Sequence, residues 1–97
     1  MTAGRYFVYM ITNKYNNVLY TGVTGNLANR IHEHKIHLRK SFTARYNCEK
    51  LVYYKEFSEI ADAIVFEKKL KRWRRNWKDS LIAHMNPLLE DLWPSII

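Results

Sequence analysis

The feature that most constrains the fold is a run of β-branched and aromatic side chains near the N-terminus, residues 5–12. Side chains of a strand point alternately to its two faces, and both alternating sets in this run are largely apolar. A strand of this kind is buried on two sides, as an inner strand between covering layers. The run therefore predicts a central strand.

A turn follows this strand and returns the chain as a second one. Residues 13–16 have turn chemistry, with asparagines that tolerate left-handed backbone, and residues 18–22 again have the pattern of a strand. With a loop of residues 13–16, the register places Tyr9 opposite Tyr20, with β-carbons about 5 Å apart on one face. The hairpin is therefore expected to bring two phenols together, whereas a one-residue change of register would separate them.

A helix is predicted immediately after the hairpin, from a capping threonine or asparagine to about Lys35. Leu27 and Ile31 form its buried stripe. Arg30 and His34 lie one turn apart and flank that stripe, so they border the core without filling it. Both side chains are expected to line a cleft.

The second half of the chain predicts one more strand and two more helices. Residues 36–50 have no sustained period and are interpreted as a loop that is partly helical, and residues 51–57 form the third strand. Helices follow over about 59–73, with Ser58 as its N-cap, and over about 76–85. The inward-facing side chains predicted for these two helices are Ile60, Ala63, Ile64, Leu70, Trp77, Leu81 and Ile82.

These elements predict an α/β (α+β) fold in the order β-β-α-β-α-α. The expected sheet has three antiparallel strands in the order second, first, third, and helices flank it. A chain of 97 residues is too short to enclose two separate cores, so we expect a single domain over residues 1–97.

The charge balance predicts a polyanionic partner. Sixteen Lys and Arg against nine Asp and Glu leave a formal charge of +7, which favours a polyanion such as nucleic acid over an acidic small molecule. Anionic membrane is the rival partner, but the longest apolar stretch is far shorter than the roughly 20 residues of a spanning helix. Cys48 is the only cysteine, so no internal disulfide forms, which suits a soluble protein of the reducing cytoplasm.

Glu67 is the one carboxylate that the helical period turns toward the core. At about 100° per residue it falls on the same face as Ala63 and Leu70. A buried carboxylate needs a cation, because burial of a bare charge costs several kcal/mol. Two partners stay open: Lys71, one turn further along, in an ion pair, or a hard divalent metal ion with waters and phosphate oxygens.

Tyrosine, arginine and histidine side chains beside the hairpin can together bind and cleave a phosphodiester. Arg30 suits a bidentate grip on phosphate, and His34 suits proton transfer. Each residue alone is common in cores or on surfaces, so only the combination with Tyr9 and Tyr20 is informative. The candidate contacts to the nucleic-acid backbone are Lys35, Arg39, Lys40, Arg45, Lys68, Lys71, Arg72 and Arg75.

In this ordered set the chain resembles the GIY-YIG nuclease superfamily, in particular its small stand-alone members. Phe7-Val8-Tyr9 takes the place of the first motif, Tyr20-Thr21-Gly22 the second, Arg30 that of the arginine helix, and Glu67 that of the metal-binding glutamate. His34 falls where homing endonucleases of this superfamily carry a functional histidine, and Asn86 resembles the asparagine near the end of such domains. Gly22 and Asn86 are expected to support the site.

The resemblance implies one divalent metal ion, Mg²⁺ or Mn²⁺, held by Glu67, with water as the nucleophile. Tyr9 or Tyr20 would deprotonate or orient that water, Arg30 would stabilise the pentacovalent phosphate, and His34 would assist with proton traffic or leaving-group contact. A tyrosine base needs nearby cations to lower a pKa that is normally near 10.

The chain departs from the family pattern at Phe7, Thr21 and Val23. Val23 replaces the lysine that repair nucleases place just after the motif glycine, so another basic residue such as Lys35 has to supply that cation. Our leading hypothesis is a metal-dependent DNA endonuclease. The alternatives are a nucleic-acid-binding module of the same fold without turnover, and a protein-interaction domain whose basic face binds an acidic partner.

Overall fold

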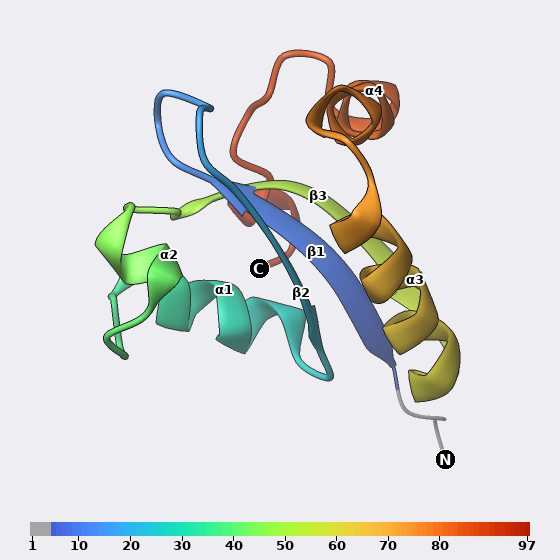
Figure 1. Ribbon diagram of the computed structural model, residues 1–97. Helices are drawn as coiled ribbons and strands as arrows, with labels where there is room; N and C mark the ends of the chain where they lie inside the picture. The colour runs from blue at the N-terminus through green and yellow to red at the C-terminus, as the bar shows by residue number, and fades with distance from the viewer. Residues whose placement is uncertain (1–4) are drawn as a thin grey trace.

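The computed structural model describes residues 5–97 and has a three-stranded antiparallel sheet at its centre (Figure 1). The strands are β1 (Tyr6–Thr12), β2 (Leu19–Thr24) and β3 (Lys50–Phe57), in the spatial order β2-β1-β3. The predicted fold class and strand order are confirmed. β1 is the inner strand, as the apolar character of both its faces predicts.

Helices cover both faces of the sheet (Figure 1). They are α1 (Leu27–Lys35), α2 (Phe42–Arg45), α3 (Ile60–Arg72) and α4 (Arg75–Met85), followed by the 3₁₀ turn η1 (Trp93–Ser95). No helix of the described chain is long and apolar enough to cross a membrane.

The central strand separates two apolar clusters. Val8 and Met10 are fully buried on the side where α3 packs, and Tyr9 and Ile11 are fully buried on the side of α1, against Ile31. Alternate residues of β1 thus belong to different cores. Any side chain of β1 that takes part in a site is therefore held rigidly from both directions.

The hairpin register differs from the prediction by two residues. Tyr9 pairs with Gly22, and Ile11 is the residue opposite Tyr20. The loop between the strands runs over residues 13–18 and is closed by the Thr12 hydroxyl, which donates to a loop carbonyl at 2.6 Å. Because strand side chains alternate with period two, a shift of two residues keeps both tyrosines on one face. Their ring centroids lie 6.4 Å apart.

The buried stripe of α3 is narrower than predicted. Ala63, Glu67 and Leu70 face the sheet as expected, but Ile60 and Ile64 are 44% and 36% exposed. Ile64 follows Ala63 by one step of about 100°, which turns it away from the contact. The stripe of α3 thus holds a carboxylate between two apolar side chains.

Two further predictions for the C-terminal helices are wrong. Trp77 is 52% exposed, although Ile82 of the same helix is buried as predicted. Ser58 does not cap α3: the N-cap is Glu59, whose side chain makes no capping hydrogen bond.

Residues 36–50 contain the short helix α2, capped by Ser41, whose hydroxyl accepts from the Ala44 amide.

The C-terminal segment, residues 86–97, ties the two layers together. The Asn86 side-chain amide donates to the Val52 carbonyl of β3 at 3.2 Å, and Asp91 accepts from the Leu51 amide at 3.1 Å. The same Asp91 carboxylate forms an ion pair with Lys35 at the end of α1. Lys35 and Asn86 therefore stabilise the fold through these contacts.

Candidate active site

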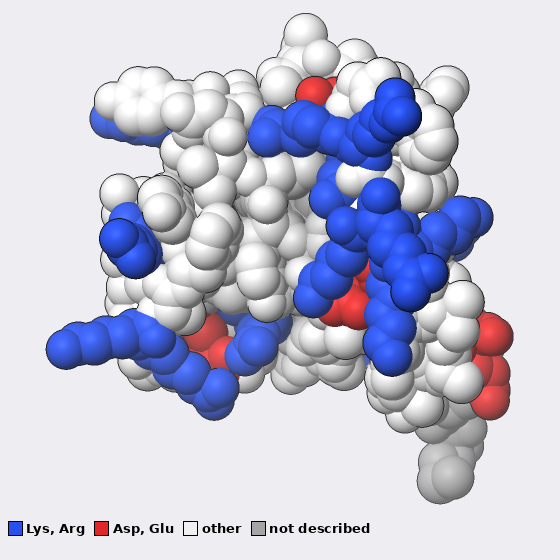
Figure 2. Space-filling view, viewed as in Figure 1, with Lys and Arg blue, Asp and Glu red and all other residues white. Residues whose placement is uncertain are grey.

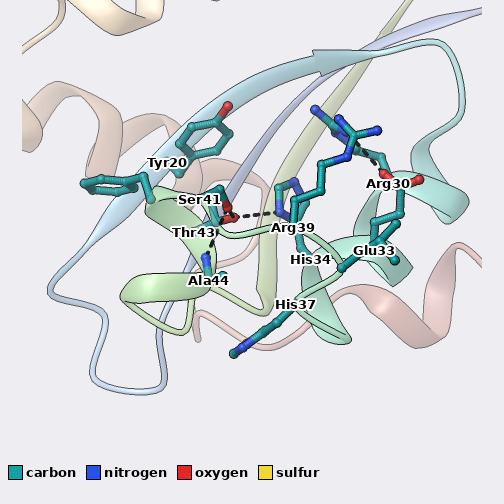
Figure 3. A pocket seen from close by; sticks show the side chains of 11 residues that line it. Tyr20, Arg30, Glu33, His34, His37, Arg39, Ser41, Thr43 and Ala44 are labelled. Carbon is teal, nitrogen blue, oxygen red and sulfur yellow. Dashed lines mark hydrogen bonds and ion pairs between the residues drawn. The ribbon is translucent and has the colours of Figure 1, made fainter.

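A cavity of about 240 Å³ lies between β2, α1 and α2 (Figure 3). Tyr20 of β2 lines one side of it, and α1 contributes Arg30, Glu33 and His34. The other walls are formed by residues 37–39 of the loop after α1 and by Ser41 to Ala44. Three of the four predicted catalytic side chains thus reach one cavity, although they come from different elements.

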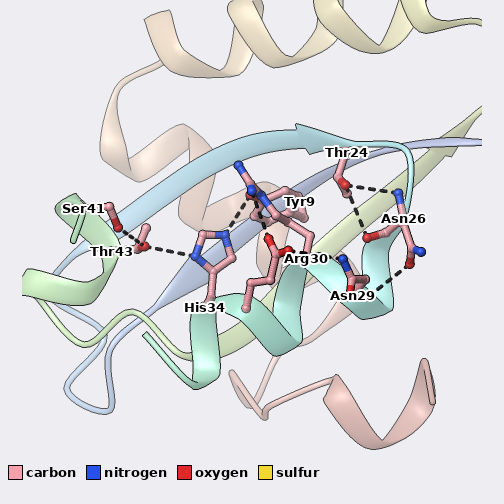
Figure 4. A network of polar contacts seen from close by, with 9 residues as sticks. Tyr9, Thr24, Asn26, Asn29, Arg30, His34, Ser41 and Thr43 are labelled. Atoms are coloured by element: carbon pink, nitrogen blue, oxygen red, sulfur yellow. Dashed lines mark hydrogen bonds and ion pairs between the residues drawn. The ribbon is translucent and has the colours of Figure 1, made fainter. Parts of the chain in front are cut away.

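The fourth, Tyr9, lies behind the cavity wall and is connected to it through His34 (Figure 4). Its hydroxyl is 2.9 Å from His34 Nε2, and His34 Nδ1 is 3.0 Å from the Thr43 hydroxyl, which in turn is 3.0 Å from the Ser41 hydroxyl. Tyr9 itself has no exposed surface. It therefore reaches the cavity only through the imidazole.

Both members of the Tyr9–His34 pair are neutral at neutral pH. Burial raises the pKa of Tyr9 to about 12, although Arg30 opposes that rise. Burial, with a contribution from the positive charge of Arg30, holds the pKa of His34 below its usual value. In a neutral imidazole one ring nitrogen donates and the other accepts, so His34 connects the Tyr9 and Thr43 hydroxyls in a chain that can relay a proton.

Gly22 makes room for Tyr9, the residue opposite it on β1. A β-carbon added at Gly22 would lie 2.5 Å from the Tyr9 hydroxyl oxygen and 2.6 Å from Cζ, far inside ordinary contact distance. The end of the Tyr9 phenol therefore lies directly against Gly22. A side chain at position 22 would displace the ring that contacts His34.

Arg30 is half-exposed and keeps donors available. Its Nη1 donates to the Glu33 carboxylate at 3.1 Å, and its Nε is buried. A hydrogen bond with the Tyr9 hydroxyl raises the pKa of Arg30, so the guanidinium stays charged. The remaining Nη donors beside a polar cavity suit an anion with several acceptor oxygens.

Tyr20 is the tyrosine that faces the cavity, and its ring is central to the group. Its centroid lies 6.0 Å from the His34 ring and 6.3 Å from the Phe42 ring. On its other side, the Lys71 ammonium of α3 lies 6.0 Å from the ring centroid. Lys71 is thus a cation beside the second motif tyrosine, Tyr20. The sequence suggests Lys35 as the substitute for the lysine that Val23 replaces.

Glu67 does not line this cavity. It is 9% exposed on the opposite side of the sheet from α1, and its carboxylate forms an ion pair of 2.7 Å with Lys71. Lys71 thereby bridges Glu67 and Tyr20. Of the two partners that the sequence leaves open for Glu67, the ion pair is the one present in this structure.

The residues present nevertheless suit a magnesium-type ion. Within residues 5–97 no three His, Cys, Asp or Glu side chains are grouped as metal ligands, so the protein supplies no closed cage. Mg²⁺ is commonly held by one or two carboxylates, with waters and substrate phosphates completing its shell. Glu67 is such a carboxylate, and its partner Lys71 is half-exposed and free to turn toward solvent.

The GIY-YIG catalytic domain family matches residues 5–80, which span all three strands, α1, α3 and the site just described. The chain belongs to the GIY-YIG catalytic domain family. Members of this family are generally endonucleases and typically use divalent metal ions, and membership implies a nucleic-acid substrate.

The fold also matches a solved structure. The solution NMR structure of the UPF0213 protein BH0048 from Bacillus halodurans is 24% identical, with a TM-score of 0.58, over 90% of this chain and 92% of that one. This similarity supports the GIY-YIG fold and nothing finer. No curated protein sequence matches the chain significantly.

Basic side chains flank the GIY-YIG site. Figure 2 shows Lys and Arg gathered over α3 and the start of α4 and, separately, over α1 and α2, with a largely uncharged band between them. Arg39 lines the cavity, and Lys40 and Arg45 are exposed nearby in sequence. Lys68, Lys71 and Arg72 are exposed on α3. Arg75 is also exposed but is partly engaged, since it donates to the Asn16 carbonyl at 2.7 Å and pairs with Asp79.

Sequence reasoning missed several cavity residues, namely Glu33, Ser41, Phe42 and Thr43. Glu33 orients Arg30, and Thr43 orients His34. The sequence offers one local signal for this part of the cavity wall: Ser41, a residue type that caps helices, precedes α2. The contact of Thr43 with His34 joins residues of different elements, which no local pattern indicates.

Proposed function

We propose that the protein is a metal-dependent endonuclease that hydrolyses phosphodiester bonds of DNA at the cavity between β2 and α1, and that residues 1–97 act as one domain. The observation that carries this proposal is the convergence of Tyr20, Arg30 and the Tyr9–His34 pair on one cavity. Basic side chains on both flanks of the cavity add the electrostatic attraction that a nucleic-acid strand needs.

In the proposed mechanism Arg30 binds the scissile phosphate. The Nη donors that Glu33 leaves free match two phosphate oxygens, on which negative charge grows as the bond breaks. Glu33 holds the guanidinium through Nη1 and leaves the other donors free. Preorganised charge of this kind needs no rearrangement during the reaction, which is why it stabilises the transition state effectively.

Tyr20 would orient the attacking water, and His34 would transfer its proton. Tyr20 lines the cavity and can orient the attacking water, whereas Tyr9 is buried and acts as a positioning residue that holds His34. A neutral imidazole accepts a proton at one nitrogen while it donates from the other. The chain from Tyr9 through His34 to Thr43 therefore supports proton transfer at His34 Nδ1, the nitrogen on the side of Thr43 and the cavity, while Nε2 is held by Tyr9.

Glu67 does not line the cavity; it would hold the Mg²⁺ or Mn²⁺ ion in place of Lys71, whose ammonium lies 6.0 Å from the centroid of the Tyr20 ring. When bound, such an ion neutralises phosphate charge and lowers the pKa of water. The metal ion would replace Lys71 as the cation beside the buried carboxylate, and the Lys71 side chain, which is 50% exposed, can turn its ammonium to water. Arg39, Lys40, Arg45, Lys68 and Arg72 are the residues we assign to backbone contact with DNA.

The test is cleavage of branched, nicked and single-stranded DNA by purified protein with Mn²⁺, against the same mixture with a chelator. We expect Glu67→Gln, Arg30→Ala and Tyr20→Phe each to lower the cleavage rate at least about a hundred-fold, because each removes a group that acts on the reacting phosphate or water. Glu90→Gln is the matched control, since that exposed carboxylate lies on the C-terminal segment. Full activity in Glu67→Gln or Arg30→Ala rejects the site.

A second function is favoured by one observation, the Lys71–Glu67 ion pair. If that pair persists with substrate bound, the protein is a DNA-binding module without turnover. Its signature is salt-sensitive binding of all the DNA substrates with no cleavage by the wild type in Mn²⁺. Undetectable binding even at low salt would instead favour an acidic protein partner.

A further inference from the structure

Two aromatic side chains of the α2 region, one at the cavity and one packed against it, are largely exposed and have no role in the core. Phe42 lines the cavity and is 50% exposed, and Tyr46, one turn further, is 40% exposed. Their ring centroids are 4.8 Å apart, and Phe42 also lies 6.3 Å from the Tyr20 ring. α2 is anchored by Thr43, which is buried and contacts His34, so the exposed rings are not needed for packing.

The surroundings of these rings are basic. Between Glu33 and Glu49 the sequence has four Lys and Arg residues and no carboxylate. The Arg45 guanidinium lies 5.6 Å from the Tyr46 ring centroid, and Arg39 lines the same cavity as Phe42. Aromatic rings interleaved with cations are the combination that binds a single strand, where rings stack on bases and cations contact phosphates.

We propose that Phe42 and Tyr46 form a stacking subsite for an unpaired base of the DNA strand whose phosphate occupies the cavity. Phe42 borders both the cavity and Tyr20, so the base it stacks on belongs to a nucleotide next to the scissile phosphate. Bases inside a duplex already have both faces stacked, and extruding one costs a few kcal/mol. The subsite therefore favours single-stranded, flapped or branched DNA over intact duplex. This inference rests on the proposed function for the identity of the strand.

The test separates base contacts from phosphate contacts in a chelator, where no cleavage occurs. Affinity is measured for an oligothymidylate and for an oligomer of the same length built of abasic tetrahydrofuran units, which has the phosphates without the bases. Wild type is expected to prefer the thymidylate, and Phe42→Ala to lower that preference between about five-fold and a hundred-fold. The salt dependence of the remaining binding should not change, because no phosphate contact is lost.

Matched variants distinguish stacking from simple loss of apolar surface. Phe42→Trp should keep the preference and Phe42→Leu should lose it, since only the first retains a ring. Leu38→Ala removes an exposed apolar side chain of the same cavity and should leave the preference unchanged. Tyr15 is another tyrosine with a cation over its ring, since the Lys14 ammonium lies 5.1 Å from the ring centroid. Tyr15→Ala is therefore the control for Tyr46→Ala.

These experiments test the stacking subsite independently of the nuclease activity. An unchanged thymidylate preference in both Phe42→Ala and Phe42→Leu overturns the subsite, even if the wild type cleaves DNA. A lost preference supports it, even if no DNA is cleaved with Mn²⁺. A dimer in sedimentation that Phe42→Ala dissociates, with the preference intact, would place a second copy on the rings and also overturn the proposal. Thermal unfolding of each variant confirms that it is folded.

Discussion

Replacement of Gly22 by alanine tests how closely the hairpin holds the site. The new β-carbon would lie 2.5 Å from the Tyr9 hydroxyl oxygen and 2.6 Å from Cζ, whereas ordinary contacts begin near 3.4 Å. The ring therefore has to move by nearly 1 Å within a fully buried environment. That movement also strains the 2.9 Å contact between Tyr9 and His34.

The expected loss of stability follows from three contributions. Overpacking of a well-packed interior costs about 1–3 kcal/mol, and loss of one neutral hydrogen bond costs about 0.5–1.5 kcal/mol. Alanine lowers the conformational entropy of the unfolded chain, which stabilises the protein by about 0.4–1 kcal/mol. This gain applies at position 22 because the φ angle of Gly22 is not positive. The net effect is a loss of about 0.5–4 kcal/mol, or a melting temperature lower by about 2–30 °C.

Urea unfolding followed by circular dichroism measures this loss, with Gly25→Ala as the control. Gly25 also has no positive φ, and its added β-carbon meets nothing closer than 4.0 Å, so that variant should be neutral or slightly stabilised. In a Tyr9→Leu background, where the phenol is absent, Gly22→Ala should cost little. Equal losses for the two glycine variants, or the same loss with Leu at position 9, would refute the close contact as the cause.

Three further predictions test other parts of the structure. Because burial and Arg30 hold the pKa of His34 below its unfolded value of 6.5, the unfolded chain binds the proton first, so stability falls as pH drops below 6.5 and His34→Gln should show a flatter pH dependence in urea unfolding. Asn86→Ala should lower the free energy of unfolding by about 1–3 kcal/mol, since it leaves a buried β3 carbonyl unpartnered, as thermal and urea denaturation will show. Lys71→Gln should tighten Mn²⁺ binding about two- to five-fold, measured by electron paramagnetic resonance, because it removes the ammonium that competes for Glu67.

Clear results would contradict each of these. An unchanged pH profile in His34→Gln would mean that this histidine is not buried as neutral imidazole. Full stability of Asn86→Ala would mean that the C-terminal segment does not depend on its amide. Equal Mn²⁺ affinities for Lys71→Gln and the control Lys68→Gln would mean that the ion pair does not compete with the metal.

Secondary structure and strand order followed from local chemistry. Two apolar faces on residues 5–12 required an inner strand, and the stripe of Leu27 and Ile31 required a helix on one face of it. The hairpin register did not follow, because the length of the loop before β2 depends on hydrogen bonds such as that of Thr12 with its carbonyl partner. The tyrosines still share a face, since an even shift preserves strand alternation.

Burial was predicted less well where it depended on a second element. Trp77 and Ile60 are apolar residues on helices, yet both are largely exposed, because no element within residues 5–97 covers those turns. No local pattern indicated two tertiary contacts, the ion pair of Lys35 with Asp91 and the hydrogen bond of Asn86 with the Val52 carbonyl.

The residue types and spacings alone determined which elements form, and that Tyr9, Tyr20 and Arg30 can come together beside the hairpin, because strand and helix periods are local properties of the chain. Only the tertiary structure decided what each of them can do. It buried Tyr9 against His34, left Tyr20 open to the cavity and buried Glu67 on the other side of the sheet with Ala63 and Leu70 of α3. Those differences arise from contacts between residues as far apart in sequence as β1 and α3, where burial and charge act through space.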